Sequence, residues 1–488
     1  MSSFDQHPPP DNEMPTEKKI LSEVSIDRES PDEGIIKDWG DKEESALRRK
    51  IDFILLPILG LAFFALQVDR GNISTALTST ITEDLGITTN QINIGTQLLS
   101  AGIVITEIPS NIVLQRIGPQ VWLSIQLFAW GLVATFQAFV HTYPAYLATR
   151  LLLGMLEGGF IPGALYYLST WYKKGETSFR TTLFFFGQMF AAATSSLISA
   201  GLLKLSGRCG FSGWQWIFLV EGLITIFAGI LFTLLLPPKA GNGYPLISLK
   251  RWSYFTPRES HIIRNRVLLD DPRKARGHLK ITASDIWNTM RQPTTIQHFF
   301  ITLVAMSGFQ GLTQYTPSMI KSFGFSAVRA NALASVPIYC SMIWCLGLSY
   351  FADRSGYRGP FVLLSITWNV VSYACLRTIT PYSSSRWHKY GVIAVANISY
   401  ASMHVLNIGW LSVYCKTPQE RSVSMALIVM AANCAGISGS QIFRTSDKPK
   451  YLHGLTAICI LAGASWVLTV VLGVQYYSKK RKAVGDAV

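Results

Sequence analysis

The stretch from residue 52 to residue 78 reads DFILLPILGLAFFALQVDRGNISTALT, an apolar run that carries the charged pair Asp69 and Arg70 near its end. A helix needs about 20 mostly apolar residues to cross the hydrocarbon core of a bilayer. The run is long enough to do so, and we therefore predict that it is a membrane span. Its polar end is where function is expected, because ionised side chains are rare inside membranes.

Eleven more runs of this kind follow, and the twelve fall into two sets of six. The predicted spans lie near residues 52–78, 91–114, 121–140, 145–168, 179–203, 215–236, 297–320, 330–352, 361–380, 390–413, 422–443 and 454–477. Hydrophobic residues make up 49% of the chain and charged residues only 15%, against about a quarter in soluble domains. We predict an all-α membrane protein with twelve transmembrane helices.

The two sets of spans end in similar motifs at equivalent positions. Arg116-Ile117-Gly118 ends the second span, and Arg354-Ser355-Gly356 ends the eighth. Two six-helix repeats of equal spacing are typical of secondary transporters, whose halves rock around a central site. The expected units are a disordered cytosolic tail (1–50), a first half (51–236), a cytosolic central loop (237–295), a second half (296–477) and a cytosolic C-terminal tail (478–488).

Charge outside the spans predicts the orientation. Lys and Arg concentrate in the loops on the side of the two chain ends, which places both ends in the cytosol. The tail 1–50 is polar and rich in acidic residues, with Pro8, Pro9 and Pro10 in succession, so we expect a disordered segment and no cleavable signal peptide. We predict that the central loop forms amphipathic helices that lie on the inner leaflet.

Ionisable residues inside spans are functional candidates by default. All of them lie in the first half: Asp69, Arg70, Glu107, Arg150, Glu157 and Glu221. The second half offers neutral polar groups instead, namely Gln310, Gln314, Tyr315, His404, Asn407 and Asn433. The net charge of +14 comes from short loops between spans, which argues against a nucleic-acid partner.

Arg150 and Glu157 are two helical turns apart, so they share one face of the fourth span, and Gly154 beside them permits close approach of a neighbouring helix. A buried carboxyl group favours its neutral form, which makes Glu157 a candidate for binding and releasing a proton. A guanidinium group matches a carboxylate in bidentate geometry. Competition between a proton and arginine for one carboxylate would couple proton entry to anion release. The alternative interpretation is structural, with Arg150 neutralising Glu157 or Glu107.

Other chemistries find no support. The chain has no phosphate-binding G-x-x-x-x-G-K-[ST] motif, no nucleophile elbow G-x-S-x-G and only scattered histidines, so we predict no enzyme, no cofactor and no metal site. The proton gradient would be the driving force.

The residues then resemble a known family over nearly the whole membrane region. The motifs that carry the resemblance are Gly347…Ala352-Asp353-Arg354-Ser355-Gly356-Tyr357-Arg358, Asp69-Arg70-Gly71-Asn72, Glu107-Ile108-Pro109-Ser110-Asn111, Arg150-x-x-x-Gly154-x-x-Glu157-Gly158, Trp171-Tyr172, Trp216-x-Phe218-x-x-Glu221-Gly222 and Asn433 through Gln441-Ile442-Phe443. The first is similar to the signature loop of the major facilitator superfamily. The others resemble its anion:cation symporters, and most of all the fungal allantoate permease branch.

The resemblance implies roles for single residues. Asp69 and Glu157 would carry protons, and Arg70 and Arg150 would hold the substrate carboxylate, with Asn433 lining the cavity from the second half. Gln314 and Tyr315 are added as candidates for substrate contact. Asp353, with Arg116, Arg354 and Arg358, would gate the cavity, Asp353 acting as a latch near span eleven. The chain departs from the pattern at Gln115, where the superfamily usually has Asp, and at Ser349, where it usually has Gly.

These observations favour a monomeric, proton-coupled importer of a small organic carboxylate, such as allantoate or a vitamin-like anion, in the plasma membrane. Two alternatives stay open: an exporter of a secondary metabolite on the same fold, and a nutrient receptor that has lost transport and signals through its tail and central loop.

Overall fold

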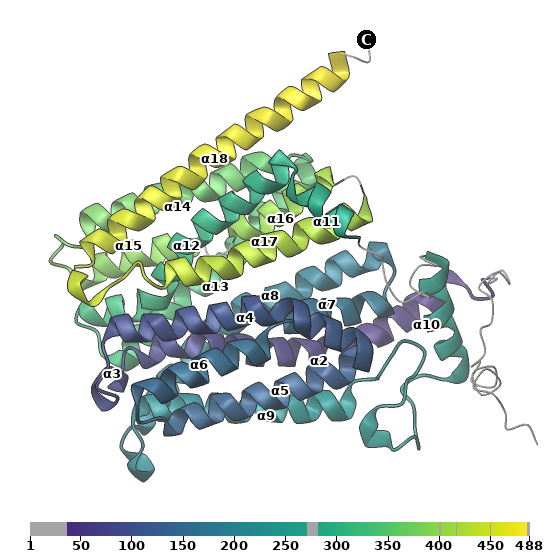
Figure 1. Cartoon of the computed structure of the whole chain (residues 1–488), viewed down its shortest axis with the longest axis horizontal. Coiled ribbons are helices and arrows are strands. Elements are labelled where there is room, and N and C mark those ends of the chain that lie inside the picture. The colour runs from purple at the N-terminus through teal and green to yellow at the C-terminus, as the bar shows by residue number, and fades with distance from the viewer. Residues whose placement is uncertain (1–36, 271–281, 400–401, 416, 449, 486–488) are drawn as a thin grey trace, which may run out of the picture.

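The computed structural model describes residues 37–270, 282–399, 402–415, 417–448 and 450–485, and this part of the chain is a long helical bundle (Figure 1). The helices of the first half are α2 (Asp41–Ala76), α3 (Ile81–Asp84), α4 (Thr89–Ile117), α5 (Pro119–Phe136), α6 (Tyr143–Glu157), α7 (Phe160–Trp171), α8 (Lys174–Leu202) and α9 (Gly213–Leu235). Each predicted span of this half corresponds to one of these helices, and the fourth is shared by α6 and α7.

Two short helices follow the first half, and the second half repeats its layout. The connecting helices are α10 (Pro257–Asp270) and α11 (Ala283–Met290), and the second half consists of α12 (Pro293–Ser322), α13 (Ala327–Ser355), α14 (Gly359–Ile379), α15 (Arg386–Ile398), α16 (Ser402–Tyr414), α17 (Pro418–Gly439) and α18 (Leu452–Gly485). Within the described residues, ten helical stretches are long and apolar enough to cross a membrane. With α12 and α17 they account for all twelve predicted spans.

Helix contacts repeat between the halves, which confirms the predicted pair of six-helix units. In the first half α2 packs on α8 and α9, α4 on α6, and α5 on α9. The equivalent pairs of the second half are α12 with α17 and α18, α13 with α15, and α14 with α18. The interface between the halves is also symmetric, because α8 packs on α13 and α4 packs on α17.

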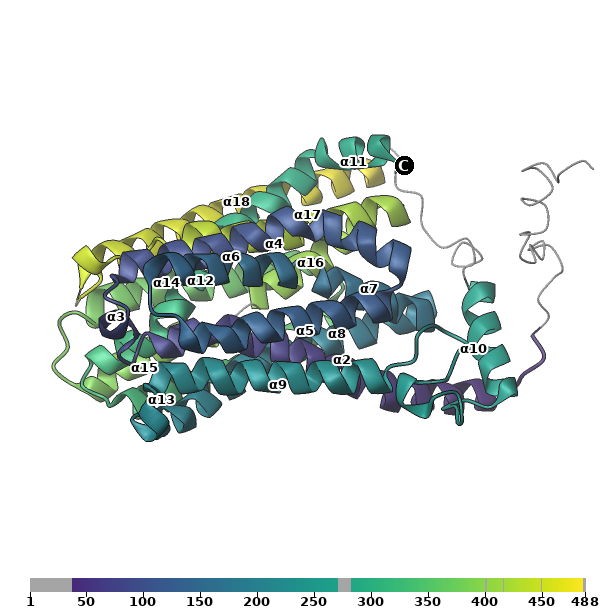
Figure 2. The ribbon, with the colours of Figure 1, turned by 60° about the horizontal axis from the view of Figure 1, so that its bottom comes forward.

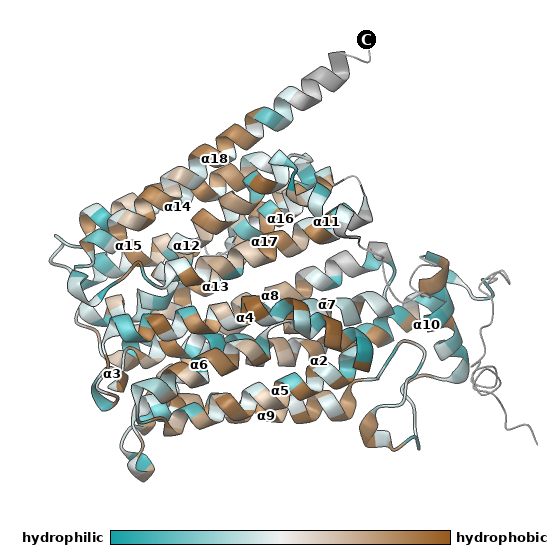
Figure 3. Cartoon of the chain, in the orientation of Figure 1, coloured by the Kyte–Doolittle hydropathy of each residue, from teal (hydrophilic) through white to brown (hydrophobic). Residues whose placement is uncertain are grey.

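The bundle has two different ends, which we call the α10 end and the α3 end after the short helices located there (Figures 1 and 2). Hydrophobic residues line the helices between the two ends, and hydrophilic residues gather in the connections and on α10 (Figure 3). This distribution is the one expected of helices that cross a bilayer.

The predicted tail 1–50 is too long at its C-terminal side, because α2 begins at Asp41; residues 1–36 lie outside the described part of the chain. The first turns of α2 are helical because ion pairs hold them. Glu44 pairs with Lys173 at the start of α8, Lys50 lies 2.8 Å from Glu259 of α10, and Arg258 lies 2.8 Å from Glu43. Likewise, α18 continues as a helix to Gly485, beyond the predicted start of the C-terminal tail at residue 478.

Candidate functional site

The fourth span is broken directly after its acidic residue. Helix α6 ends at Glu157 and α7 begins at Phe160. Gly159 adopts φ +83°, a left-handed conformation that glycine adopts at little cost. Backbone groups freed by a break inside a membrane need partners, and the buried amide of Gln126 donates to the carbonyls of Leu156 (2.9 Å) and Gly158 (2.8 Å). Glu157 is thus fixed at a bend in the middle of the bundle.

Span ten, the equivalent of span four in the second half, comprises α15, which ends at Ile398, and α16, which begins at Ser402; residues 400 and 401 lie outside the described part of the chain. Interrupted spans point to the binding site in transporters built from repeats. The break in span four therefore indicates a central site beside Glu157.

Small residues bring α6 and α4 into close contact, as predicted from Gly154. A methyl group added at Gly154 would come within 2.1 Å of the Leu99 carbonyl oxygen, and one added at Gly102 within 2.8 Å of the Leu151 carbonyl oxygen. Backbones that approach this closely pack rigidly. The position of Glu157 is therefore also set by α4.

An ion pair joins Glu157 to the first span. Arg70 Nε lies 2.8 Å from Glu157 Oε2. The arginine side chain is 21% exposed, whereas the glutamate side chain is fully buried. Arg70, and not Arg150 as the structural alternative supposed, is the arginine in ion-pair contact with Glu157.

Arg150 is buried as well. Its guanidinium carbon lies 5.4 Å from the ring centroid of Tyr146 and 5.3 Å from that of Phe218, distances at which a cation is attracted to a ring face. Arg150 Nη2 donates a long hydrogen bond of 3.5 Å to Asn72 Oδ1. No carboxylate of the described residues lies within 4 Å of Arg150, and its Nε has no hydrogen-bond acceptor there.

Asp69 is the second predicted proton-binding residue, and it is completely buried. Thr225 of α9 donates from Oγ1 to Asp69 Oδ2 at 2.8 Å. The carboxyl groups of Asp69 and Glu157 are close enough to act on each other electrostatically, and Arg150 acts on Asp69 in the same way. Asp69, Arg70, Arg150 and Glu157, which we call the charged cluster, therefore lie together.

Asn433 reaches this region from the second half. Its side chain meets the carboxyl group of Glu107 on α4, and Arg70 lies close enough to Glu107 to act on its charge. Through Glu107, Asn433 and Arg70 therefore border one shared region, to which α2, α4 and α17 each contribute a side chain.

Gln314 and Tyr315, the other candidates for substrate contact, bond across the interface between the halves. The Tyr315 hydroxyl donates to Asn93 Oδ1, and Gln314 Nε2 lies 3.4 Å from the same oxygen. Asn93 in turn donates to the Phe443 carbonyl oxygen at 3.0 Å. These contacts hold α4 against α12 and the end of α17.

Further hydrogen bonds between the halves gather toward the α3 end. Lys321 Nζ donates to the Thr78 carbonyl oxygen (2.7 Å) and Asn331 Nδ2 to Thr78 Oγ1 (2.8 Å). Lys448 Nζ donates to Thr89 Oγ1 at 2.9 Å. Together with the Asn93 contacts, they close the two halves against each other at this end.

The predicted gating residues lie at the opposite end. Asp353 is paired with Arg358 at 2.7 Å, and Arg358 Nη1 donates to the Gly409 carbonyl oxygen of α16 at 2.6 Å. Arg354 is exposed next to Tyr350, and Arg116 is exposed at the end of α4. In this structure Asp353 is therefore bonded within its own half.

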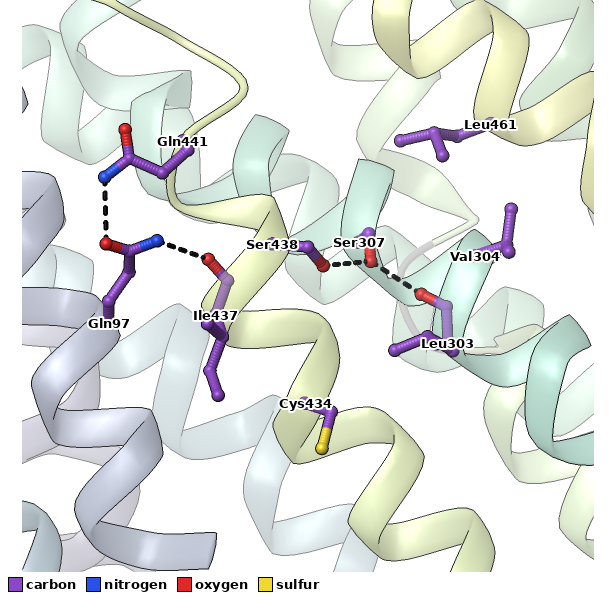
Figure 4. Close-up of a pocket in the computed structure, with 9 residues that line it drawn as sticks. All are labelled: Gln97, Leu303, Val304, Ser307, Cys434, Ile437, Ser438, Gln441 and Leu461. Atoms are coloured by element: carbon purple, nitrogen blue, oxygen red, sulfur yellow. Dashed lines mark hydrogen bonds between the residues drawn. The ribbon is translucent and has the colours of Figure 1, made fainter.

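A groove of about 570 Å³ is lined by residues outside the charged cluster (Figure 4). Its walls are Gln97 of α4, Leu303, Val304 and Ser307 of α12, Cys434, Ile437, Ser438 and Gln441 of α17, and Leu461 of α18. Gln97 donates to the Ile437 carbonyl oxygen (3.1 Å) and accepts from Gln441 (3.0 Å). Because its polar side chains bond mainly to one another, the groove presents mostly apolar surface.

Several residues of the region were missed by sequence reasoning. Asn93, Gln126 and Thr225 contact the charged cluster, the break or the interface, as described above. Asn93 and Gln126 are amides inside predicted spans, a signal that could have been used. Thr225 carried no such signal, because threonine is common in apolar helices.

Twelve spans in two matched halves, with buried ionisable groups beside the break in span four, define a membrane transporter. A family model supports this class directly, since it matches residues 59–440. The chain belongs to the Major Facilitator Superfamily. It is a multi-pass membrane protein and not an enzyme, as predicted.

Similar proteins agree with this assignment. The chain is 28% identical over 422 residues to an uncharacterized transporter of Saccharomyces cerevisiae, covering 85% of this chain and 77% of that one. It is 26% identical over 419 residues to the MFS-type transporter cnsO of Penicillium expansum, with coverage of 84% and 78%.

Solved structures share the fold. The xylose transporter XylE from E. coli, in a partially occluded inward open conformation, matches with a TM-score of 0.64 at 13% identity, over 85% of this chain and 97% of that one. A bacterial homolog to the human lysosomal transporter Spinster, inward-facing and occupied, matches with a TM-score of 0.62 at 14% identity, over 91% and 98%. These likenesses confirm the predicted fold.

Proposed function

We propose that this transporter takes up a small organic carboxylate together with protons, by alternating access. The observation that carries the proposal is the Arg70–Glu157 ion pair, in which the acid is buried and the arginine is the exposed partner. Protonation of Glu157 removes the negative charge that holds Arg70. The freed guanidinium group then has its hydrogen-bond donors available for a substrate carboxylate.

The rest of the charged cluster supports an anionic substrate. Arg150 is a buried cation with no carboxylate of the described residues in salt-bridge contact, and an unpaired buried charge is costly. An anion bound near Arg70 lowers that cost by adding negative charge to the same region. Asn433 would then contact the anion from the second half. The motifs quoted above favour the anion:cation symporter family and its allantoate permease branch, and so a substrate such as allantoate or a carboxylated vitamin.

The loop charges predict how the protein is oriented in the membrane. If the α10 end faces the cytosol, as the Lys and Arg distribution predicts, the α3 end faces outward. The bonds at Thr78, Thr89 and Asn93 then close the outer side, and the state is inward-facing. We propose that the protein works as a monomer in the plasma membrane, with both chain ends cytosolic.

Uptake into proteoliposomes tests the proposal, with radiolabelled allantoate, nicotinate, pantothenate and biotin as the probes. An inward proton gradient should stimulate accumulation of at least one of them in the wild type. Glu157→Gln imitates the protonated acid and should abolish this stimulation while it leaves substrate exchange across the membrane intact. Glu83→Gln, which changes an exposed acid on α3, is the matched control and should behave like the wild type. Equal stimulation in Glu157→Gln and the wild type would contradict the proposed coupling.

A further inference from the structure

The buried acids of the first half outnumber the arginines next to them. Asp69, Glu157 and Glu221 are each at most 1% exposed. Arg70 and Arg150 are the cations of the region, and among the described residues only Glu157 is in salt-bridge contact with one of them. Three ionised carboxylates and two guanidinium groups would leave a net negative charge in low-dielectric surroundings, which is strongly disfavoured.

Of the three acids, Glu221 has the least positive charge near its carboxyl group. Its Oε1 accepts a hydrogen bond of 2.9 Å from Ser199 Oγ of α8, and its Oε2 has no hydrogen-bond partner among the described residues. The charged group that acts on it is Asp69, another acid. Asp69 Oδ1 likewise has no partner there, so each acid has one free oxygen.

Among the described residues, the elements packed against this part of α9 supply no compensating cation in contact. Helix α8 contributes the neutral Ser199, and α5 contributes Trp130, which faces Asp69. Arg150 stacks on Phe218 of α9 and acts on Asp69, and Lys204, just beyond α8, is exposed. The threonine one turn after Glu221, Thr225, bonds to Asp69 and so places the two acids side by side across the α2–α9 contact.

We infer that Glu221 and Asp69 form a second proton-binding site, distinct from Glu157, and that Glu221 carries a proton in this state of the transporter. The proton comes from a hydronium ion of the bulk water: one O–H bond of hydronium breaks, one O–H bond forms on a carboxylate oxygen of Glu221, and a water molecule is left. Asp69 then connects Glu221 to Glu157, so that three carboxyl groups extend from the partly exposed Arg70 into the contact between α8 and α9. The role in transport rests on the proposed proton coupling.

Infrared spectroscopy of the purified protein in lipid nanodiscs tests the site without any substrate, with the proton as the ligand. At neutral pH the wild type should show carbonyl absorption of protonated carboxyl groups. Ser199→Ala should move one component of it, because the hydrogen bond to Glu221 is lost. That component should be lost completely in Glu221→Gln. It should persist in Glu107→Gln, the matched control, which removes another intramembrane acid.

Two results would overturn the inference: no component that responds to Ser199→Ala, or such a component that survives in Glu221→Gln. Ser199→Ala keeps the test valid if Glu221→Gln does not fold, as judged by size-exclusion chromatography. Failure of gradient-driven uptake in the wild type would refute the proposed function alone, because the infrared signal needs no transport. Loss of the signal with intact coupled uptake would refute only the second site.

Discussion

Asn93 is the residue whose removal should most clearly change the balance between the conformations. Its side chain donates to the Phe443 carbonyl oxygen and accepts from Tyr315 and Gln314, all in the second half. A hydrogen bond contributes about 0.5–1.5 kcal/mol net, so the two shorter bonds together contribute about 1–3 kcal/mol to closure. Asn93→Ala should therefore raise the population open at the α3 end about 5- to 150-fold.

The rate of thiol modification measures this population even when it is small. A cysteine replaces Ser100, which is 8% exposed and lies against Gly436 of the other half, in a chain whose seven native cysteines are substituted. A membrane-impermeant reagent is applied from the α3 side. Asn397→Ala is the matched control, because that buried amide bonds to Thr316 and Ile393 within its own half. Equal rates for Asn93→Ala, Asn397→Ala and the parent would refute the reasoning.

Three further predictions concern stability. Gly154→Ala forces a methyl group against the Leu99 carbonyl and should destabilise the protein by about 1–3 kcal/mol, measured by thermal unfolding in detergent; Gly463→Ala, with open space around it, should be tolerated, and equal losses would contradict the packing argument. Arg266 is fully buried, with Glu176 at 3.2 Å, so Arg266→Leu should cost about 3–5 kcal/mol and release α10 to limited proteolysis, unlike an exposed control, Arg264→Leu. Partial burial opposes ionisation of Glu259, but Lys50 and the Thr256 amide hold the pKa of its carboxyl group below the usual 4.5. Its contribution to α10 docking should be complete above about pH 4.5 and lost as the pH falls through the lowered pKa, which hydrogen exchange of α10 would detect; a profile identical to that of Glu259→Gln would argue against it.

Most of the fold could be predicted because each span is a continuous apolar run that needs no knowledge of its neighbours. The helical start of α2 could not be predicted, because residues Asp41 to Lys50 are mostly polar. Their ion-pair partners, such as Lys173 and Glu259, lie far along the chain. The break after Glu157 was signalled by the pair Gly158-Gly159.

The candidate site was predicted as a set of residues but not as a set of contacts. Helical spacing places Arg150 and Glu157 on one face, yet it does not say which helix packs against that face. The partner of Glu157 is Arg70, 87 positions away, while Arg150 turns toward Tyr146, Phe218 and Asn72. Contacts between helices depend on their rotation and depth, which single-sequence periodicity does not encode.

The amide of Gln126 has a consequence for how the protein moves. It binds the carbonyls of Leu156, in the last turn of α6, and of Gly158, in the break of span four, and α5 packs on both α6 and α7. Helix α5 therefore restrains the end of α6 and limits bending at the break. Glu157 should move with α5 as one rigid body, so under the proposed alternating access the motion that exposes it to either side of the membrane takes place at the interface between the two halves.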